Sequence, residues 1–495
     1  MKEWMKKLQL HYERIRSLHP EDRLMILFDI DGTILDMRHM ILSTLRSFDN
    51  RHGTHYFRDL KIGNIRVHET NIVALLDKLT IREKDTARVV DWYEQNFWSA
   101  DAVMESHRPF VGVMEVIRWF QIQPKTFVGL NTGRPECIRA DTLHSLNKIG
   151  QEFKVRFGNE FLYMNRNGWE GDIVTSKVAG ILHFQKCGYR VFACVDNEPE
   201  NLRAIADVDA QKQILLLHAD TLFKSKRKRL PPHAVSGKRY DLAALIHEKA
   251  LPKHVQFVWH GVNDEANLRQ FLASGIQWAE CDVRLDHARD RVVLRDDSFE
   301  SAPLQEEERL LTLEDILDPI QRTGKSVKLD LKENGVLIDR VLWVLRRHSF
   351  DGMNLWFNGR VDELKQEGFS KLTKAFPQSI IQVPIDCLVP LILSVPGEAL
   401  ALLDKFRSWG VNRFSMSWKS SNIHRVLDKL DKWGFEANIY NVPDLESFLQ
   451  AVLLLPTSVT SDFNFPKWHY YGRGSGENQK RHSYEIVKTT QSLSL

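Results

Sequence analysis

Two carboxylates at the end of the apolar segment RLMILFDIDGTIL have the type and spacing that phosphoryl transfer requires. Asp29 and Asp31 are two residues apart, so the period-two alternation of a strand points both side chains the same way. One such carboxylate can attack phosphorus and form an aspartyl-phosphate, while the other protonates the leaving oxygen and later activates water. Taken alone, these residues fit an ordinary strand end with turn-forming Asp and Gly about as well.

Three further polar residues occur in later segments of the same half of the chain. The hydroxyl of Thr132 in TFVGLNTGRPE, with the N–H groups that follow it, can hold phosphate oxygens. Lys177, just before a helical stretch in TSKVAGILHF, can neutralise phosphoryl charge. Asp196 ends the strand-like part of FACVDNEPENL, an oxygen-rich segment suited to Mg²⁺. Taken singly, the last two fit a surface lysine and an acidic helix N-terminus.

A second set of ionisable residues lies at strand-like segments of the C-terminal half. Glu280 and Asp282 alternate in WAECDVRL, Asp330 and Lys332 alternate in VKLDLKE, and His260 stands near the end of QFVWHG. Three carboxylates that converge from neighbouring strands would repel one another unless a cation lay between them. The pattern therefore predicts a second divalent cation, Mg²⁺ or Ca²⁺, although capped strand ends explain any one of these residues alone.

The elements that carry the first set predict a parallel α/β sheet in residues 1–223. Buried-strand patterns (LMILFDI, TFVGLNT, RVFACVD, QILLLH) are separated there by amphipathic helical stretches. The first two strands are about ninety residues apart, far more than one crossover helix needs. Three helical patterns fill that interval (HMILSTLRSFDN, NIVALLDKLTI, TARVVDWYEQNFW), so we expect an inserted helical cap at about residues 36–124.

The remaining elements predict a closed (β/α)₈ barrel at residues 254–472. Eight strand patterns alternate with helical stretches: QFVWHG, QWAECDV, SVKLDLK, NLWFNG, IIQVPID, NRFSMSW, EANIYNV and SVTSD. Residues 224–253 begin with a basic run and continue with a Pro pair and Gly, which predicts an exposed linker. Residues 473–495 are expected to be a polar tail.

The order DxDGT, Thr, Lys and Asp resembles the haloacid dehalogenase superfamily of phosphatases over roughly residues 20–220. The resemblance implies a Rossmann-like sheet in which Asp29 is the nucleophile and Asp31 the acid/base. It also implies that Thr132 and Lys177 bind phosphate. An Asp at the second position favours phosphoester hydrolysis over dehalogenation.

The same resemblance implies a Mg²⁺ ion held by Asp29, Asp196 and the main-chain carbonyl of Asp31. The fourth motif reads DNEPE here, instead of a double Asp or GDxxxD. This difference leaves open whether Asn197 or Glu200 assists the metal. In the family, inserted cap helices cover the substrate and set specificity, so the motifs do not predict which phosphomonoester is cleaved.

The C-terminal half resembles the glycerophosphodiester phosphodiesterase-like barrels, most closely the menorin-like branch. The segments are WHGVNDEANLRQFLASGIQWAECDV, KSVKLDLKE, and IYNVPDLESF to VTSDFNFP. The resemblance implies that His260 is one catalytic histidine and that Lys332 contacts phosphate. It implies a divalent-metal site made by Glu280, Asp282 and Asp330.

This half departs from the phosphodiesterase pattern at two places. Arg295, in VVLRDD, stands where the family has a second histidine, and HGV replaces HRG after His260. An arginine cannot exchange protons near neutral pH, so acid/base catalysis by two histidines cannot operate as the family runs it. Arg295 can still bind a phosphate.

Composition narrows the function classes further. The 495 residues are 43% hydrophobic and 27% charged with a net charge of +3, so no nucleic-acid partner is expected. Five scattered Cys argue against a disulfide scaffold and a structural zinc site. The N-terminus lacks an apolar secretion-signal core, and the apolar stretches are too short to span a membrane. We therefore expect a cytoplasmic protein.

The favoured prediction is a Mg²⁺-dependent phosphohydrolase joined to a barrel that binds a phosphorylated ligand without turning it over. The alternative is a bifunctional enzyme, in which the barrel hydrolyses a glycerophosphodiester and the first domain dephosphorylates the product. Phosphoryl transfer to an acceptor sugar, or within one molecule, is a third possibility. The expected partners are a small phosphorylated substrate and, for the barrel, a lipid-derived phosphodiester.

Overall fold

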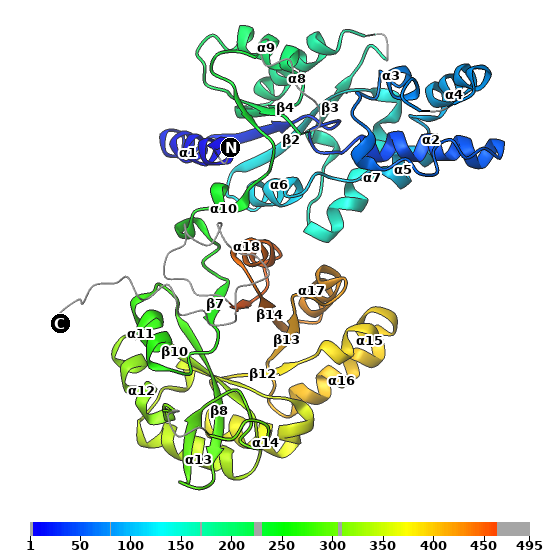
Figure 1. Ribbon diagram of the computed structural model, residues 1–495. Helices are drawn as coiled ribbons and strands as arrows, with labels where there is room; N and C mark the ends of the chain where they lie inside the picture. Colours follow the sequence, from blue (N-terminus) through cyan, green and yellow to red (C-terminus); the bar gives the residue numbers. More distant parts are fainter. Residues whose placement is uncertain (1–2, 80, 169–170, 222–229, 305–308, 463–495) are drawn as a thin grey trace. The chain divides into compact units, whose positions relative to one another are not determined.

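The computed structural model describes residues 3–79, 81–168, 171–221, 230–304 and 309–462 (Figure 1). The chain forms two compact units, Met1–His247 and Glu248–Leu495. Within the described ranges, none of the helices combines the length and the apolar character that a bilayer-spanning helix requires.

The first unit is built on a six-stranded parallel sheet in the order β3-β2-β1-β4-β5-β6. The strands are β1 (Arg23–Phe28), β2 (Thr126–Pro135), β3 (Leu162–Asn165), β4 (Tyr189–Asp196), β5 (Leu215–Ala219) and β6 (Val235–Gly237). The central strand β1 is an unbroken apolar run because helices cover the sheet on both faces. Strand order reverses around β1, and ligands of open parallel sheets bind outside the carboxyl ends of the strands at such a point.

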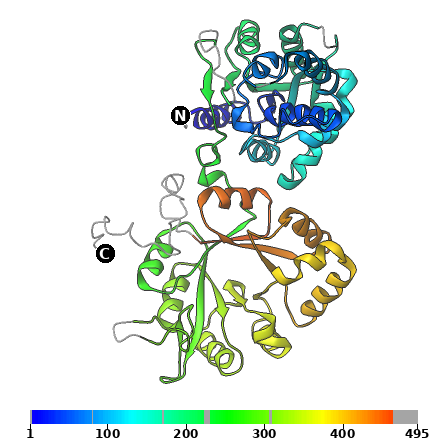
Figure 2. The same cartoon turned by 45° about the vertical axis from the view of Figure 1, so that its right-hand side comes forward.

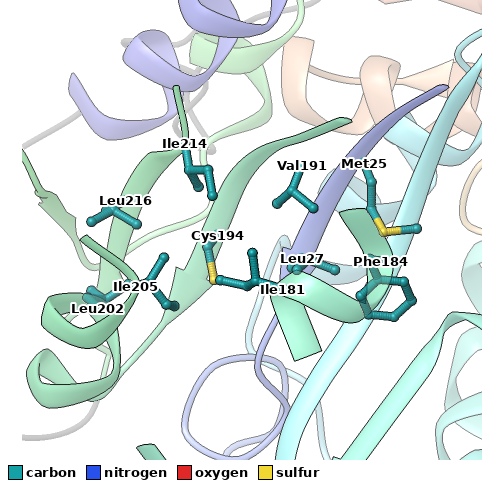
Figure 3. Packing of buried hydrophobic residues seen from close by; sticks show 10 residues of the cluster. All are labelled: Met25, Leu27, Ile181, Phe184, Val191, Cys194, Leu202, Ile205, Ile214 and Leu216. Carbon is teal, nitrogen blue, oxygen red and sulfur yellow. The ribbon is translucent and has the colours of Figure 1, made fainter. Parts of the chain in front are cut away.

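Helices and buried apolar side chains hold this sheet. The main helices outside the inserted segment are α1 (Glu3–Leu18), α6 (Val113–Gln121), α7 (Arg139–Gly150), α8 (Ile173–Lys186), α9 (Pro199–Val208) and the short α10 (Leu242–Leu245). Figure 3 shows residues of β1, β4 and β5 packed against α8 and α9. That cluster contains Met25, Leu27, Ile181, Phe184, Val191, Cys194, Leu202, Ile205, Ile214 and Leu216.

Between β1 and β2 the chain forms helices, as the sequence predicts. They are α2 (Arg38–His52), α3 (Val73–Leu76), α4 (Glu83–Asn96) and α5 (Ala100–Ser106), followed by α6. α2 packs against α4 and α5, whereas α6 packs against β2 of the sheet. The expected cap of residues 36–124 thus ends, in the structure, with a helix that belongs to the sheet layer.

The second unit is a closed barrel of eight parallel strands, which confirms the eight predicted strands (Figure 2). They are β7 (Gln256–Trp259), β8 (Trp278–Asp286), β10 (Ser326–Leu331), β11 (Leu355–Asn358), β12 (Ile380–Pro384), β13 (Arg413–Ser417), β14 (Glu436–Val442) and β15 (Ser458–Ser461). Pairing of β8 with β10 closes the ring, and β9 (Arg291–Leu294) adds to β8 as an antiparallel hairpin strand. The α/β fold class with a parallel sheet and a barrel is confirmed.

Helices surround the barrel on its outside (Figures 1 and 2). They are α11 (Glu265–Ala273), α12 (Leu313–Arg322), α13 (Val336–Arg347), α14 (Val361–Ala375), α15 (Val389–Ser394), α16 (Pro396–Ser408), α17 (Ile423–Lys432) and α18 (Leu445–Leu453). The parallel register of β8 and β10 sets Asp282 beside Asp330 and Glu280 beside Lys328. The two predicted ligand strands therefore bring their polar residues to the same levels.

The segment 224–253, expected as a linker, contains ordered elements of the first unit. β6 pairs with β5, and the indole of Trp4 in α1 donates to the Arg239 carbonyl at 2.7 Å. Gly237 is required here, because a Cβ at that position would lie 2.2 Å from the Trp4 ring. The basic run Lys224–Arg229 and the tail 473–495 lie outside the described residues.

Candidate functional sites

Asp29 and Asp196 lie on either side of the Lys177 ammonium group at the carboxyl end of the first sheet. Lys177 donates to Asp29 Oδ1 at 2.5 Å, to Asp196 Oδ2 at 2.8 Å and to the Asn131 carbonyl at 2.7 Å. The N–H of Asp29 donates to the Val195 carbonyl at 2.9 Å, which ties the end of β1 to β4. The sequence placed Lys177 just before a helix, and in the structure it lies inside α8.

Burial dominates the electrostatics of this group. Burial raises the pKa of Asp29 to about 7; Lys177 opposes the rise, and Asp196 and Asp31 add to it. Burial alone would lower the pKa of Lys177, but Asp196 and Asp29 outweigh it and hold that pKa above its ordinary value. Three buried ionisable groups in contact are typical of a functional site.

Backbone and amide groups orient the remaining carboxylate oxygens. Asp196 accepts from the Glu198 N–H at 2.8 Å and from Asn201 Nδ2 at 3.1 Å on both of its oxygens. The Thr33 hydroxyl lies 3.3 Å from Asp29 Oδ2 and 3.3 Å from Asn197 Oδ1. These contacts hold the carboxylates in place on a rigid part of the fold.

The turn after β1 depends on glycine. Gly32 has φ +75°, and a Cβ there would lie 2.5 Å from Asn197 Nδ2. A side chain at this position would be strained by its backbone and would collide with the loop after β4. The DxDGT glycine therefore allows the loops after β1 and β4 to approach each other.

Asp31 points to a partner that the sequence analysis missed. Arg134, near the end of β2, donates Nε to Asp31 Oδ2 at 2.8 Å and Nη2 to Asp31 Oδ1 at 2.6 Å. Thr132 lies on the same strand end, and its hydroxyl accepts from the Arg134 N–H at 3.2 Å. The arginine in TGRP, directly after the predicted phosphate ligand, was the available signal.

Residues of the inserted segment approach this site. His68 Nε2 lies 3.4 Å from Glu69 Oε1 and 3.7 Å from Glu198 Oε1, so a cap residue contacts the loop after β4. Burial raises the pKa of Glu69 to about 7, and the charge of Asp31 adds to the rise. Neither residue stood out in the sequence, because nothing in their local pattern indicates the distant carboxylates.

The barrel brings its three predicted acids together. Glu280, Asp282 and Asp330 each offer a carboxylate oxygen, and these oxygens lie within 4.8 Å of one another. In the described part of the chain, this is the one group of three or more metal-ligand side chains that close together. Asp330 stands near the carboxyl end of β10, the end at which barrel active sites are built, and Asp282 pairs with it from β8.

Lys332, expected to contact phosphate, lies against these acids. Its ammonium group is 2.8 Å from Asp282 Oδ1, 2.7 Å from Asp330 Oδ2 and 2.9 Å from Asp296 Oδ1. Burial tends to lower the pKa of Lys332, but Asp330 and Asp282 outweigh it and raise that pKa. Lys332 therefore neutralises part of the cluster from within the chain.

His260 adjoins the same cluster. Its Nε2 is 3.5 Å from Glu280 Oε2, and its Nδ1 is 3.2 Å from Asp462 Oδ1. Burial, with the charge of Asp282, raises the pKa of Glu280 to about 8, while the Gly261 N–H donates to its Oε2 at 2.8 Å. The predicted histidine and metal ligands are thus brought into one site.

Arg295 lies beside the site, directly after β9, but its side chain binds its own loop. Its N–H donates to the Asp282 carbonyl at 2.8 Å, and Nη1 donates to the Ala302 carbonyl at 2.7 Å. The guanidinium also lies 5.0 Å from the centre of the Phe299 ring. Part of its binding capacity is therefore used within the loop.

Three residues around the barrel site were missed in the sequence. Asn263 bonds both the side chain and the N–H of Asp282, at 2.7 Å and 2.9 Å. Lys328 is buried at the level of Glu280, where burial lowers its pKa despite Glu280 and Asp330 nearby. Asn358 donates to Asp330 Oδ1 at 2.5 Å. They lie on or beside the predicted strands, but strand alternation alone does not identify them as partners.

Comparisons with known proteins give structural matches only. No family model matches the chain, and a search of curated proteins finds no match. A phosphodiesterase of Oleispira antarctica in complex with the product sn-glycerol-3-phosphate matches at 18% identity, covering 44% of this chain and 95% of its own, with a TM-score of 0.34.

Two further solved structures represent a phosphodiesterase and a phosphatase-like hydrolase, one of each. A glycerophosphodiester phosphodiesterase from Agrobacterium tumefaciens matches at 13% identity and TM-score 0.31, covering 43% of this chain and 98% of its own. A hydrolase of the haloacid dehalogenase-like family from Streptococcus pneumoniae matches at 12% identity and TM-score 0.28, covering 43% of this chain and 94% of its own. Both classes that the sequence motifs resemble are therefore represented among the structural matches.

Proposed function

We propose that the first unit is a Mg²⁺-dependent phosphohydrolase that cleaves a phosphomonoester through an aspartyl-phosphate on Asp29. The observation that supports this most strongly is the contact of the Lys177 ammonium with both Asp29 and Asp196, at 2.5 Å and 2.8 Å. Burying such ions is costly unless they are paired, and a fold that gathers them at a strand-order reversal is suited to an anionic substrate.

In the first half-reaction, an oxygen of Asp29 attacks phosphorus while the bond from phosphorus to the leaving oxygen breaks. Protonated Asp31 gives its proton to that leaving oxygen. Lys177 offsets the negative charge of the transferred group, and Thr132 with the N–H groups after it binds phosphate oxygens. The products of this step are the free alcohol and an acyl phosphate on Asp29.

In the second half-reaction, water attacks the phosphorus of the acyl phosphate. The Asp31 carboxylate takes a proton from that water, and the bond between phosphorus and the Asp29 oxygen breaks. Inorganic phosphate leaves, the Asp29 carboxylate is restored, and Asp31 is again protonated. Phosphoryl transfer to an acceptor hydroxyl would follow the same steps with the acceptor in place of water.

The oxygen donors around Asp29 fit Mg²⁺, which prefers hard ligands. Asp29, Asp196 and the main-chain carbonyl of Asp31 would hold the ion. When bound, Mg²⁺ would withdraw charge from the phosphoryl oxygens. Burial raises the pKa of Asp29 to about 7, the charges of Asp196 and Asp31 add to the rise, and a bound cation would favour the ionised carboxylate. Of the two candidates for assistance, Asn197 is favoured, because its Oδ1 lies 3.3 Å from the Thr33 hydroxyl beside Asp29.

For the barrel, we propose binding of a phosphate-bearing ligand, with a lipid-derived phosphodiester as the candidate. The acids Glu280, Asp282 and Asp330 would hold a divalent cation, and Lys332 and Arg295 supply positive charge beside them. The imidazole of His260 lies 3.5 Å from Glu280 Oε2, and Arg295 cannot replace a second histidine in proton transfer. The alternative, a diesterase that supplies the phosphatase, is supported by His260 at 3.5 Å from Glu280.

A substrate screen on the whole chain tests these proposals. The wild type is incubated with phosphomonoesters and glycerophosphodiesters, with Mg²⁺ and after chelation. Monoester hydrolysis that needs Mg²⁺ is expected, and its absence for every monoester would contradict the phosphatase. Asp29→Asn serves to separate the units: diester cleavage that persists in this variant and disappears in His260→Ala would establish the bifunctional alternative.

A further inference from the structure

The guanidinium of Arg134 is buried against the proposed acid/base residue, although the proposed mechanism gives it no task. Its side chain is 1% exposed, and its two donors meet the two oxygens of Asp31 at 2.8 Å and 2.6 Å. Two parallel bonds from a planar fork determine both the position and the plane of a carboxylate. A single lysine bond could not do this.

The other side of the guanidinium is held as firmly. Nη1 donates to Thr142 Oγ1 in α7 at 3.1 Å, and Nη2 lies 3.2 Å from His107 Nε2. The guanidinium carbon lies 5.0 Å from the centre of the Trp98 ring, in the connection between α4 and α5. Partners on every side keep the fork from swinging away from Asp31.

The protonation state of His107 follows from this arrangement. Arginine has only donors, so His107 Nε2 must accept, and the ring proton is then on Nδ1. Nδ1 lies 2.7 Å from Ser145 Oγ, whose hydroxyl donates to the Val103 carbonyl at 3.0 Å. Burial and the charge of Arg134 lower the pKa of His107 to about 3, so the ring stays neutral. The hydrogen bonds therefore form one series, in which Arg134 donates to His107, His107 to Ser145 and Ser145 to the Val103 carbonyl, and this series holds the guanidinium in place.

We infer that Arg134 is the positioning residue for Asp31, a role that rests on the proposed phosphohydrolase function. The bidentate pair leaves each oxygen of Asp31 a further lone pair that can carry the proton for the leaving group. Without the fork, Asp31 would lose its fixed orientation, and proton transfer would lose the advantage of a preset geometry. Arg134 thus acts through Asp31 and not on the phosphate.

Leaving-group dependence distinguishes this role from a merely structural one. Phenyl phosphate and p-nitrophenyl phosphate have similar shapes, but only the weaker leaving group, phenol, needs a proton from an acid. Arg134→Met is expected to lower kcat/KM for phenyl phosphate by about 100-fold. For p-nitrophenyl phosphate the loss is expected to be about tenfold smaller. In Asp31→Asn, adding Arg134→Met should cause little further loss, because both changes affect the same proton transfer.

Two control variants distinguish a loss of positioning from a loss of folding. Arg134→Lys keeps the charge but cannot form the fork, so it should show the same leaving-group selectivity. Arg139→Met removes a neighbouring arginine paired with Glu136 at 2.7 Å, and should change neither substrate's rate. Thermal unfolding of each variant reports its fold.

Equal losses for both phosphates in Arg134→Met and Arg134→Lys, or no loss in either, would overturn the positioning role. Failure of the proposed function looks different. In that case the wild type would hydrolyse neither phosphate, or Asp29→Asn would keep its activity.

Discussion

At the residue scale, Asp29 must be both buried and reactive, and its neighbours reconcile these demands. Lys177 supplies a positive charge at 2.5 Å, and the N–H of Asp29 is used in a bond to β4. A carboxylate in this setting is held at one position while its oxygens face other polar groups.

Asp29→Asn should abolish phosphomonoester hydrolysis without unfolding the protein. An amide cannot form the acyl phosphate, and it has nearly the same size as the carboxylate. We expect the steady-state rate to fall at least about 1,000-fold, with a thermal unfolding midpoint close to that of the wild type. Retention of more than a few per cent of the activity would remove Asp29 as the nucleophile.

Glu69 should make the first unit less stable as pH rises. Its pKa is raised by burial from an ordinary 4.5 to about 7, so the folded state binds a proton that the unfolded state releases between these values. The contribution of Glu69 to the free energy of unfolding is fully present below pH 4.5 and is lost as pH rises through about 7. The free energy of unfolding should fall by up to about 3 kcal/mol over this range.

Unfolding midpoints of wild type and Glu69→Gln between pH 4 and 8 measure this effect. The unfolding midpoint of the variant should rise relative to that of the wild type as pH increases, because glutamine has no charge to bury. Glu160→Gln, at an exposed position, is the matched control and should follow the wild type at every pH. Parallel curves for Glu69→Gln and wild type would contradict the raised pKa.

At the element scale, β8 and β10 explain why the barrel acids converge. Parallel register sets Asp282 beside Asp330, and alternation turns Glu280, Asp282, Asp330 and Lys332 toward the same interior. The same register makes Lys332 a competitor of any bound cation, because its ammonium already lies 2.8 Å and 2.7 Å from two of the acids.

Removing that internal cation should therefore strengthen divalent-metal binding by the barrel. The Asp29→Asn/Asp196→Asn background disables the first site. In this background, calorimetry with Mg²⁺ or Ca²⁺ should show tighter binding when Lys332→Met is added than when Lys332 is kept. Asp330→Asn should abolish binding. Weaker binding by Lys332→Met would mean that the lysine supports the metal site, and no binding by any variant would mean that the acids are structural.

Elements were predictable where the local pattern was strong. The eight barrel strands and β1, β2, β4 and β5 are apolar or alternating runs of usual length, and they were found. β3, β6 and β9 were not predicted, and β6, with three residues, is too short to display a period. The carboxylates of both sites could be picked out because they lie on, or directly after, strands whose pattern is easy to recognise.

Contacts between distant residues were not predictable from pattern. Arg134 and Asp31 are 103 positions apart, and neither the spacing nor the residue types reveal that they meet. Lys332 was predicted to face the same way as Asp330, but its ion pairs with the acids depend on how β8 and β10 align in space. The cap residues His68 and Glu69 reach the site through a loop without any period.

At the scale of the whole molecule, the division between Met1–His247 and Glu248–Leu495 falls within the segment 224–253 that was expected to be a linker. β6 and α10 lie beyond residue 223 and contact β5 and α1. A fragment that ends at 223 would lose a sheet strand and expose the apolar surface that Trp4 covers.

Residues 1–247 expressed alone should therefore fold, whereas residues 1–223 should be less stable. Loss of β6 and of the Trp4 contacts removes buried apolar area, so the unfolding midpoint should fall by several degrees. In the intact chain, trypsin should cut first within Lys224–Arg229, where five basic residues gather. Equal stability of the two fragments would mean that β6 and α10 do not stabilise the first unit.

The most direct test of the central proposal is covalent trapping of the phosphorylated enzyme. The wild type, mixed with a ³²P-labelled phosphomonoester that it hydrolyses and quenched in acid, should carry label on the tryptic peptide of residues 24–38. Borohydride reduction should convert Asp29 in that peptide to homoserine, as mass spectrometry would show. Turnover without labelled protein, or label on a peptide that lacks Asp29, would contradict the aspartyl-phosphate mechanism.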